Sequence, residues 1–380
     1  MDFRLSDEQQ QIRQMVRDFA EAEIRPHVME WDEAQKFPME VMKKLGGLGM
    51  LGAVFPEEYG GAGLSYIDYV NIIEQLAIVD SSVALGVAAH NSLCTGHIYL
   101  AGNEEQRKRF LPKLTSGEWI GAWGLTEPAS GSDASGLLTT AVKDGDEWVI
   151  NGTKNFITNA TYANVAVVLA ITDREDRKHG ISAFVIEMDR PGIRPGKKEN
   201  KLGMRASDTA ELVLQDCRVS DEALLGKAGY GFVDAMKVLD GGRISIGALA
   251  VGIAQGAFEA ARDYSKQRTA FGKNISEFQA IQFMLADMAT EIEAARLLCY
   301  QAAAMKDSGE KTTTYSSMAK LYASEVAVRA TERGVQIFGG YGFIKDFPAE
   351  KYYRDVKLCT IGEGTSEIQR MVIARNLLGL

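Results

Sequence analysis

The chain has 380 residues, of which 46% are hydrophobic and 24% charged, and its formal net charge is -9. This length exceeds one ordinary hydrophobic core, so two or three domains are expected. No apolar run reaches membrane-spanning length, the first residues lack a signal-peptide core, and no Lys/Arg cluster is dense enough for nucleic acid. These absences make a cytoplasmic location the expected one.

The first part of the chain has helical periodicity. Ser6 and Gln9 have capping-box spacing, and apolar residues follow at helical intervals until Pro26. Further helices are expected at about residues 38–49, 66–79, 82–101 and 104–116.

From Trp119 the pattern changes to short apolar, β-branched runs. Asp144 and Gly145 form a strong hairpin signal between two strand-like runs. Further strands are expected at about residues 165–171, 181–186 and 210–214. This middle third is typical of a compact β domain.

The helical period returns near Gly231, with helices expected to about Tyr264, over 278–305 and over 312–338. Alanine is abundant here, as in helix bundles. The order helices, strands, helices indicates an α+β protein with segregated parts. The expected domains cover residues 1–118, 119–228 and 229–380.

Cysteine and histidine give no metal or redox signal. The cysteines lie far apart, at Cys94, Cys217, Cys299 and Cys359. We expect them to be reduced and mostly buried. His90 and His97 would lie two helical turns apart, too far to share one metal without further ligands, which favours a structural role. No Rossmann glycine fingerprint or P-loop occurs, so a nucleotide cofactor would be held differently.

One carboxylate near the C-terminus stands out. Glu363 lies between Gly362 and Gly364, directly before a helix start at which Ser366 and Gln369 have capping-box spacing. Flanking glycines let another molecule come close, as a general base against a flat cofactor would require. Taken alone, the motif favours a simpler alternative, in which Glu363 only complements the positive end of the next helix.

Two segments of the β region could meet a polar ring. Residues 123–133 mix hydroxyl side chains with Gly and Pro, and offer N–H groups to a ring edge, although an ordinary turn has the same composition. In residues 151–159, Phe156 and Thr158 share a strand face, which suits stacking plus hydrogen bonding, although Phe156 could equally belong to the core.

Two segments of the C-terminal helices could meet a diphosphate. Residues 267–273 end a helix with positive charge, and residues 336–342 break another with three glycines. Arginine and close backbone approach suit a diphosphate. Each segment alone is more typical of helix C-capping.

Together these segments resemble the acyl-CoA dehydrogenase family over essentially the whole chain and in the right order. The shared motifs are Leu-Thr-Glu-Pro-x-x-Gly-Ser-Asp, Asn-Gly-x-Lys-x-Phe-Ile-Thr-Asn, Arg-x-x-Phe-Gly-Lys, Gln-Ile-Phe-Gly-Gly-Tyr-Gly and Glu-Gly-Thr-Ser. The resemblance implies a helical N-domain, a central β-barrel domain and a C-terminal four-helix bundle. It also implies FAD reaching into a neighbouring subunit of a homotetramer, an acyl-CoA substrate, and an electron-transferring flavoprotein as acceptor.

The resemblance also implies roles, position by position. Trp123 to Ser132 would contact the flavin, with Phe156 and Thr158 against its ring, and Gln336 to Gly340 would hold the adenosine end from the partner subunit. The implied cofactor contacts are Trp123, Leu125, Thr126, Ser132, Phe156, Thr158, Arg268, Phe271, Gln279, Gln336, Gly339, Gly340, Thr365 and Glu367. The implied substrate contacts are Ser132, Asp240, Arg243 and Gly364.

By the same resemblance, Glu363 is the base that removes the α proton of an acyl-CoA thioester while the β hydride passes to flavin N5. Its backbone N–H and a ribityl hydroxyl would bind the thioester carbonyl, and a dry pocket would raise its pKa. Isovaleryl- and long-chain-type members place a glutamate immediately before the arginine that is Arg243 here. This chain has Gly242 there, as in short- and medium-chain types.

Two departures from the family pattern bear on binding. Gly362 replaces a common tyrosine, which predicts a wider pocket that tolerates branched, cyclic or bulkier acyl groups. Glu367 replaces a common glutamine and could weaken one FAD contact. The alternatives are a flavoenzyme of the same fold with oxidase or decarboxylating chemistry, and a non-catalytic helical assembly protein.

Overall fold

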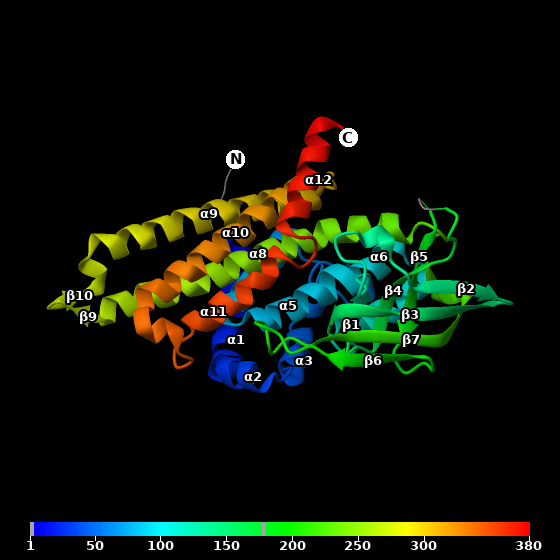
Figure 1. Cartoon of the computed structure of the whole chain (residues 1–380), viewed down its shortest axis with the longest axis horizontal. Coiled ribbons are helices and arrows are strands. Elements are labelled where there is room, and N and C mark those ends of the chain that lie inside the picture. The colour runs from blue at the N-terminus through cyan, green and yellow to red at the C-terminus, as the bar shows by residue number, and fades with distance from the viewer. Residues whose placement is uncertain (1–3, 177–178) are drawn as a thin grey trace.

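The structure is a computed structural model that describes residues 4–176 and 179–380. Helices fill one part of the molecule and the large sheet lies at one end, opposite the small β9–β10 hairpin (Figure 1). The N-terminal helices are α1 (Asp7–Glu23), α2 (Val28–Ala34), α3 (Met39–Gly47), α4 (Tyr66–Val79), α5 (Ser81–Ala89), α6 (Gly96–Ala101) and α7 (Glu104–Thr115). The predicted capping box is confirmed, because Ser6 and Gln9 exchange side-chain and backbone hydrogen bonds of 3.2 and 3.0 Å.

The helix expected over residues 82–101 differs from the prediction in its middle. Between α5 and α6 the backbone widens into a π-helical turn, His90–Thr95, whose residues are mostly buried. Asn91 Nδ2 donates to the carbonyls of Met50 and Val87 at 2.9 and 3.1 Å. These hydrogen bonds connect the π-helical turn to α5 and to the segment that contains Met50. Such π turns are common at functional sites.

The strands form one sheet of order β6-β7-β3-β2-β4-β5-β8, with β1 parallel to β4. Their bounds are β1 (Gly121–Gly124), β2 (Thr140–Asp144), β3 (Glu147–Thr158), β4 (Val165–Ile171), β5 (Ile181–Glu187), β6 (Ile193–Lys198), β7 (Thr209–Ser220) and β8 (Leu224–Leu225). The predicted hairpin is confirmed, since Asp144 pairs with Glu147 across a two-residue turn.

The sheet has two apolar faces. Ala166, Val168 and Ala170 of β4 pack into a core that strands β1 to β7 share, whereas Val165 and Val167 pack towards α6, α7 and the start of α8. The sheet thus wraps around its own core. Within the residues that the structure describes, β6 and β8 are edge strands that each pair on one side only, so the expected barrel is open.

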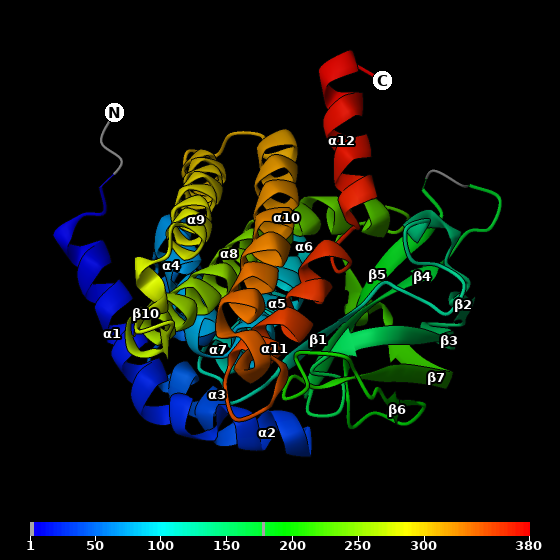
Figure 2. The ribbon, with the colours of Figure 1, turned by 60° about the vertical axis from the view of Figure 1, so that its left-hand side comes forward.

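Long helices make up the rest of the chain. They are α8 (Gly231–Gln267), α9 (Gln279–Asp307), α10 (Thr313–Phe338), α11 (Ala349–Asp355) and α12 (Ser366–Leu378), with β9 (Thr269–Ala270) and β10 (Lys273–Asn274) after α8. Helix α8 packs against α4, α5, α9 and α10, and α12 projects away from the body (Figure 2). The domain limits at 118/119 and 228/229 stay a prediction.

Helix α8 corrects the expectation that no apolar run could cross a membrane. By length and composition it is the one helix in residues 4–176 and 179–380 that could do so, and 78% of its most apolar window is buried inside the protein. Its apolar surface therefore faces other helices, as in the core helix of a soluble protein.

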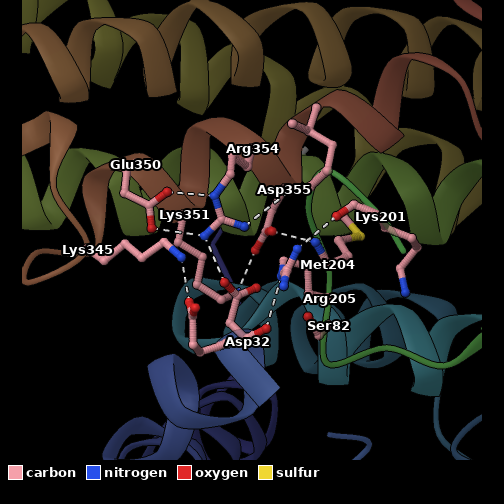
Figure 3. A network of polar contacts seen from close by, with 12 residues as sticks. Asp32, Ser82, Lys201, Met204, Arg205, Lys345, Glu350, Lys351, Arg354 and Asp355 are labelled. Atoms are coloured by element: carbon pink, nitrogen blue, oxygen red, sulfur yellow. Dashed lines mark hydrogen bonds and ion pairs between the residues drawn. The ribbon is translucent and has the colours of Figure 1, made fainter. Parts of the chain in front are cut away.

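A buried polar network joins the three parts of the chain at α11 (Figure 3). Lys351 Nζ lies 2.8 Å from Asp80 Oδ1 and 2.6 Å from Asp355 Oδ2. Asp355 also accepts hydrogen bonds from Ser81 Oγ and from the backbone N–H of Met204, in the loop between β6 and β7. Because α11 ends at Asp355, the network anchors the chain segment that leads into the turn of Glu363.

Candidate active site

Glu363 lies on a sharp turn between the short helix Val356–Thr360 and α12. Its φ is 54° and that of Gly364 is 93°, so two successive residues are left-handed, a strained arrangement for glutamate. Gln369 Nε2 donates to the carbonyls of Glu363 and Gly364 at 3.1 and 2.9 Å. Lys320 Nζ donates to the Gly364 carbonyl at 2.6 Å. Side chains from two helices therefore hold the turn.

The predicted capping box at the start of α12 is wrong. Thr365 is the N-cap, and its Oγ1 accepts a 3.3 Å hydrogen bond from the backbone N–H of Ile368. Ser366 is the first helical residue, and the Gln369 amide binds the preceding turn instead. Thr365 and Ser366 are adjacent hydroxyl residues that could each cap α12. The strained turn before them places Thr365 at the N-cap position.

The carboxylate of Glu363 packs directly against α8 at Gly242. A Cβ on Gly242 would lie 1.9 Å from Glu363 Oε2 and 3.2 Å from Leu93 Cδ2, on the π-helical turn. Glu363 Oε2 is buried and has no hydrogen-bond partner among the described residues. Burial raises the Glu363 pKa to about 7, although the charges of Lys320 and Arg243 lower it in part. Such a carboxylate is suited to take up a proton near neutral pH.

Two of the predicted substrate contacts lie beside this carboxylate. Arg243 Nη1 forms a 2.7 Å ion pair with Asp240 Oδ1, and Thr313 Oγ1 donates to Asp240 Oδ2 at 2.7 Å. The Nε atom of Arg243 is buried without a partner in the described chain. This donor is therefore free for an anionic or carbonyl group of a ligand.

The loop after β1 is held by buried polar contacts. Lys154 Nζ pairs with Glu127 Oε1 at 2.6 Å, and Glu127 also accepts from the backbone N–H groups of Leu138 and Thr139. Glu127 and Lys154 both belong to the motifs shared with the family, but the sequence predicted no role for either residue. Their buried ion pair ties the loop to β3.

Of the predicted flavin contacts, Trp123 and Leu125 are buried, and Trp123 Nε1 donates to His97 Nδ1 at 3.0 Å. Both residues share one apolar cluster, against which Leu93 packs. Since Leu93 also lies against Gly242, the π-helical turn connects the loop with the turn of Glu363. The sequence did not single out Leu93, because a leucine in a helix resembles ordinary core.

Phe156 lies on a bulge in β3, where the register with β7 shifts between Lys154 and Ile157. Its φ is 59° and 62% of its surface is exposed, whereas Thr158 is partly buried. Phe156 is therefore not core, and an aromatic ring held outward on a strained bulge is free to stack on a flat ligand. Ser132 is exposed on the preceding loop.

A second site lies at the other end of α8, where a pocket of about 410 Å³ opens beside Arg268. Gly339 and Gly340 line it, and neither has an atom within 4 Å of where a Cβ would lie. The Arg268 guanidinium stacks over Tyr341 and has no ion pair within residues 4–176 and 179–380. The remaining lining residues are Tyr264, Ile275, Ile337, Phe338 and Ile344. An unpaired arginine beside exposed glycine backbone suits a diphosphate.

The remaining predicted contacts lie near these two sites. Phe271, at 96% exposure, and Gln279 are exposed close to the Arg268 pocket in sequence, and Gln336 is exposed one turn before it. Arg268 and Gly339 line one pocket of one chain, so both would act on the same end of one cofactor, and the subunit whose cofactor they serve stays a prediction. Thr365 caps α12, and Glu367 is exposed.

Buried histidine and cysteine side chains serve packing. His90 Nε2 lies 3.0 Å from the Leu114 carbonyl, and its Nδ1 accepts from the N–H of Gly121 at 3.1 Å. The four cysteines are all buried and unpaired, as predicted. In the part of the chain that the structure describes, no three His, Cys, Asp or Glu residues are grouped as metal ligands.

An outward-held aromatic ring, a buried carboxylate oxygen with a raised pKa and a pocket beside an unpaired arginine suit a cofactor-dependent oxidoreductase, and comparison with known proteins places the chain in that class. The N-terminal, middle and C-terminal domain models of acyl-CoA dehydrogenase match residues 6–118, 122–217 and 229–378. The chain belongs to the acyl-CoA dehydrogenase family. It is an FAD-dependent oxidoreductase that dehydrogenates acyl-CoA.

Individual relatives match over almost the whole chain. A short-chain specific acyl-CoA dehydrogenase of Clostridium acetobutylicum is 50% identical over 98% of this chain and 99% of its own. Butyryl-CoA dehydrogenase from Megasphaera elsdenii is 46% identical with a TM-score of 0.98, and each chain is covered completely. A chain of a structure described as an electron transferring flavoprotein of Acidaminococcus fermentans is 49% identical, with a TM-score of 0.98 and complete coverage of both chains.

Proposed function

We propose that Glu363 is the base that removes the α proton of a short acyl-CoA thioester. The observation that carries this proposal is the buried Oε2 atom, which lacks a partner in the described structure although its pKa lies near 7. A carboxylate desolvated in this way accepts a proton that a hydrated one would leave in place. The proton taken from the substrate ends on this oxygen.

Other groups of the chain would orient the thioester. Hydrogen bonds from Lys320 and Gln369 hold the turn and so fix the direction of the backbone N–H of Glu363. We propose that this N–H donates to the thioester carbonyl, where negative charge develops as the proton leaves. Arg243, with its free Nε, would bind the CoA portion, and Gly364 lets the substrate approach the turn. Phe156, Thr158 and the loop of Trp123 would hold the flavin of FAD, which would supply the acceptor for the β hydride.

The comparisons support a short acyl group, because two of the relatives are named for short-chain and butyryl-CoA substrates. We also propose that branched groups are tolerated, since Gly362 leaves room beside the base. A Cβ there would make only 3.5 Å contacts with Leu358. Initial rates with straight, branched and cyclic acyl-CoAs test this, and strict preference for butyryl-CoA over branched groups would contradict the tolerance.

Glu363→Gln tests the assignment of the base. It removes the proton acceptor but keeps the shape, so we expect FAD and acyl-CoA binding to remain while flavin reduction slows roughly 10²–10⁴-fold. Anaerobic mixing with butyryl-CoA, followed by flavin absorbance, measures the rate. Near-normal reduction in this variant would refute the role.

We further propose that each FAD is shared between two subunits. Along α8, about 39 Å of helix axis separates Gly242, beside the base, from Arg268. The sheet and the β9–β10 hairpin accordingly lie at opposite ends of the molecule (Figure 1). One FAD cannot reach both sites of one chain, so the Arg268 pocket would receive the adenosine end of a neighbour's cofactor. This supports a homodimer at least, and we propose a homotetramer in the cytoplasm with an electron-transferring flavoprotein as acceptor, a partner that the Acidaminococcus fermentans structure supports.

Subunit mixing tests the shared cofactor. We expect Glu363→Gln and Arg268→Ala proteins to be inactive separately, because one lacks the base and the other the diphosphate site. After unfolding and refolding together with FAD, mixed assemblies contain one complete site, and activity should recover to a substantial fraction of wild type. Recovery that is absent, although mixed assemblies are detected by mass, would mean that each subunit binds its own FAD.

A further inference from the structure

Within residues 4–176 and 179–380, Lys320 is a buried lysine that forms no ion pair. It lies on α10 with no exposed surface, and no carboxylate of the described chain is within ion-pair distance of its Nζ. The other two buried lysines, Lys154 and Lys351, are each paired with carboxylates at 2.6–2.8 Å. A buried charge is costly unless it is paired. Stability alone therefore does not account for a lysine at position 320.

The polar contact that Lys320 makes is with the turn of the base. Its Nζ donates to the Gly364 carbonyl at 2.6 Å, and Gln369 donates to the same oxygen at 2.9 Å. Because Glu363 and Gly364 are both left-handed, this turn needs such support to persist. Lys320 thus acts on the backbone that carries the Glu363 side chain.

The charged groups around Glu363 are few. Arg243 of α8 faces it, but the Arg243 charge is compensated by Asp240 at 2.7 Å. Tyr69 of α4 and Cys359 before the turn are neutral near pH 7, since burial raises the pKa of the Cys359 thiol to about 12 and that of the Tyr69 hydroxyl still further. The carboxylate of Glu367, on α12, is exposed.

Lys320 is therefore the uncompensated positive charge that acts on Glu363 within the described chain. Burial lowers the Lys320 pKa to about 8, with neighbouring Glu363 partly raising it. The lysine is charged below about pH 8 and the carboxylate is charged above about pH 7, so both are ionised between these values.

We propose that Lys320 is a positioning residue for the base: it clamps the turn through the Gly364 carbonyl, and its charge keeps the buried Glu363 side chain ionised. The inference rests on the proposed role of Glu363. Lys320 would thus have two effects. Its hydrogen bond sets the geometry of the turn, and its charge sets the protonation of Glu363. Side-chain replacements can remove these effects one at a time.

Three variants of the FAD-loaded protein make this separation. Lys320→Gln removes the charge and keeps an N–H donor for the Gly364 carbonyl. Lys320→Met removes both. Gln369→Leu is the matched control, because it removes hydrogen bonds to the same turn and leaves the charge in place.

The first measurement is the rate of flavin reduction by saturating butyryl-CoA from pH 5.5 to 9.5. Loss of a neighbouring positive charge disfavours the carboxylate, so in both Lys320 variants the acid limb should move up by about one pH unit. At pH 6 the rates of both Lys320 variants should then be about tenfold lower than the rate that the same protein would have with the wild-type acid limb. At high pH, Lys320→Gln should return close to the wild-type rate. Gln369→Leu should lower the plateau at all pH values without moving the limb.

The second measurement needs no turnover. For wild type and for each variant, the melting temperature is compared with that of the same protein carrying Glu363→Gln, across pH 4.5 to 9. The pH at which this difference appears reports ionisation of Glu363, and it should move up by the same unit in the Lys320 variants only. If Lys320→Met does not fold, Lys320→Gln carries the test.

The outcomes are distinguishable. Unmoved profiles in Lys320→Gln, with Glu363→Gln inactive, would overturn the role of Lys320 and leave the base in place. A shifted profile in Gln369→Leu equal to that of Lys320→Gln would show that geometry, and not charge, sets the ionisation, which also overturns the proposal. Normal reduction by Glu363→Gln would instead refute the proposed function.

Discussion

The network around Lys351 and the turn of Glu363 both contain buried ionisable groups. The surroundings favour the charged form of Lys351 and the neutral form of Glu363. Burial alone would lower the pKa of Lys351, but the carboxylates of Asp355 and Asp80 raise it well above its usual range. Glu363 Oε2 has no such partner among the described residues, and burial raises its pKa to about 7. Buried charge that is paired stabilises one arrangement of the chain, whereas buried charge left unpaired is available to a ligand.

The largest expected effect breaks the paired side of this comparison. Lys351→Met would leave Asp80 and Asp355 buried without their cation, which costs about 3–5 kcal/mol when a buried pair loses one partner. Chemical unfolding measures the loss. Lys345→Met is the control, because Lys345 pairs with Glu33 at an exposed site, where solvent screening leaves an ion pair with little effect on stability. Equal losses in the two variants would mean that burial of the pair contributes nothing special.

A second change acts on the unpaired side without touching a charge. Gly242→Ala places a Cβ where Glu363 Oε2 now lies, so the carboxylate must move by an ångström or more. A displacement of about 1 Å at a catalytic group costs on the order of 10²-fold in rate, and we expect flavin reduction to slow by that amount. Gly241→Ala is the matched control, since its Cβ would meet the Tyr66 hydroxyl only at 3.3 Å. Similar rates for both variants would show that the contact with Gly242 does not position the base.

The smallest expected effect sharpens the comparison through pH. The folded-state pKa of Glu363, about 7, lies above its ordinary value of 4.5. Its contribution to stability is therefore complete below pH 4.5 and is lost as the pH rises through 7. Glu363→Gln should abolish this loss and be more stable than wild type at pH 8. The free energy of unfolding at pH 4.5 and pH 8 checks this, and equal pH dependence in both proteins would contradict it.

Local patterns in the sequence predicted much of the fold. Alternation in residues 210–214, the turn at Asp144-Gly145 and the capping box at Ser6 are short-range signals, and the structure has each of them. The cap of α12 failed because Thr365 and Ser366 satisfy the same local rule, and the left-handed turn before them decides between the two. The edges of the sheet also escaped prediction, since strand closure depends on long-range pairing.

Motif and chemistry together pointed to Glu363 and Arg268 in the sequence, and the structure places Glu363 on a strained turn and Arg268 in the lining of a pocket. Lys320 and Leu93 were missed for a physical reason. A lone lysine on an alanine-rich helix is ordinarily solvated, and a leucine on a helix is ordinarily core. They come close to the turn of Glu363 only through contacts with Gly364 and Gly242, which lie 44 and 149 positions away in the chain. No local rule reports such distant approaches.

The length of α8 has a consequence for handling the protein. If the flavin site and the diphosphate site for one FAD belong to different subunits, dissociation of the subunits on dilution removes part of the contacts that bind every cofactor. After unbound cofactor is removed, the amount of flavin retained per subunit would then fall with falling protein concentration and recover on reconcentration with FAD. The retained flavin would thus report the association equilibrium, and prolonged dialysis at low concentration would be a gentle way to prepare the apoprotein.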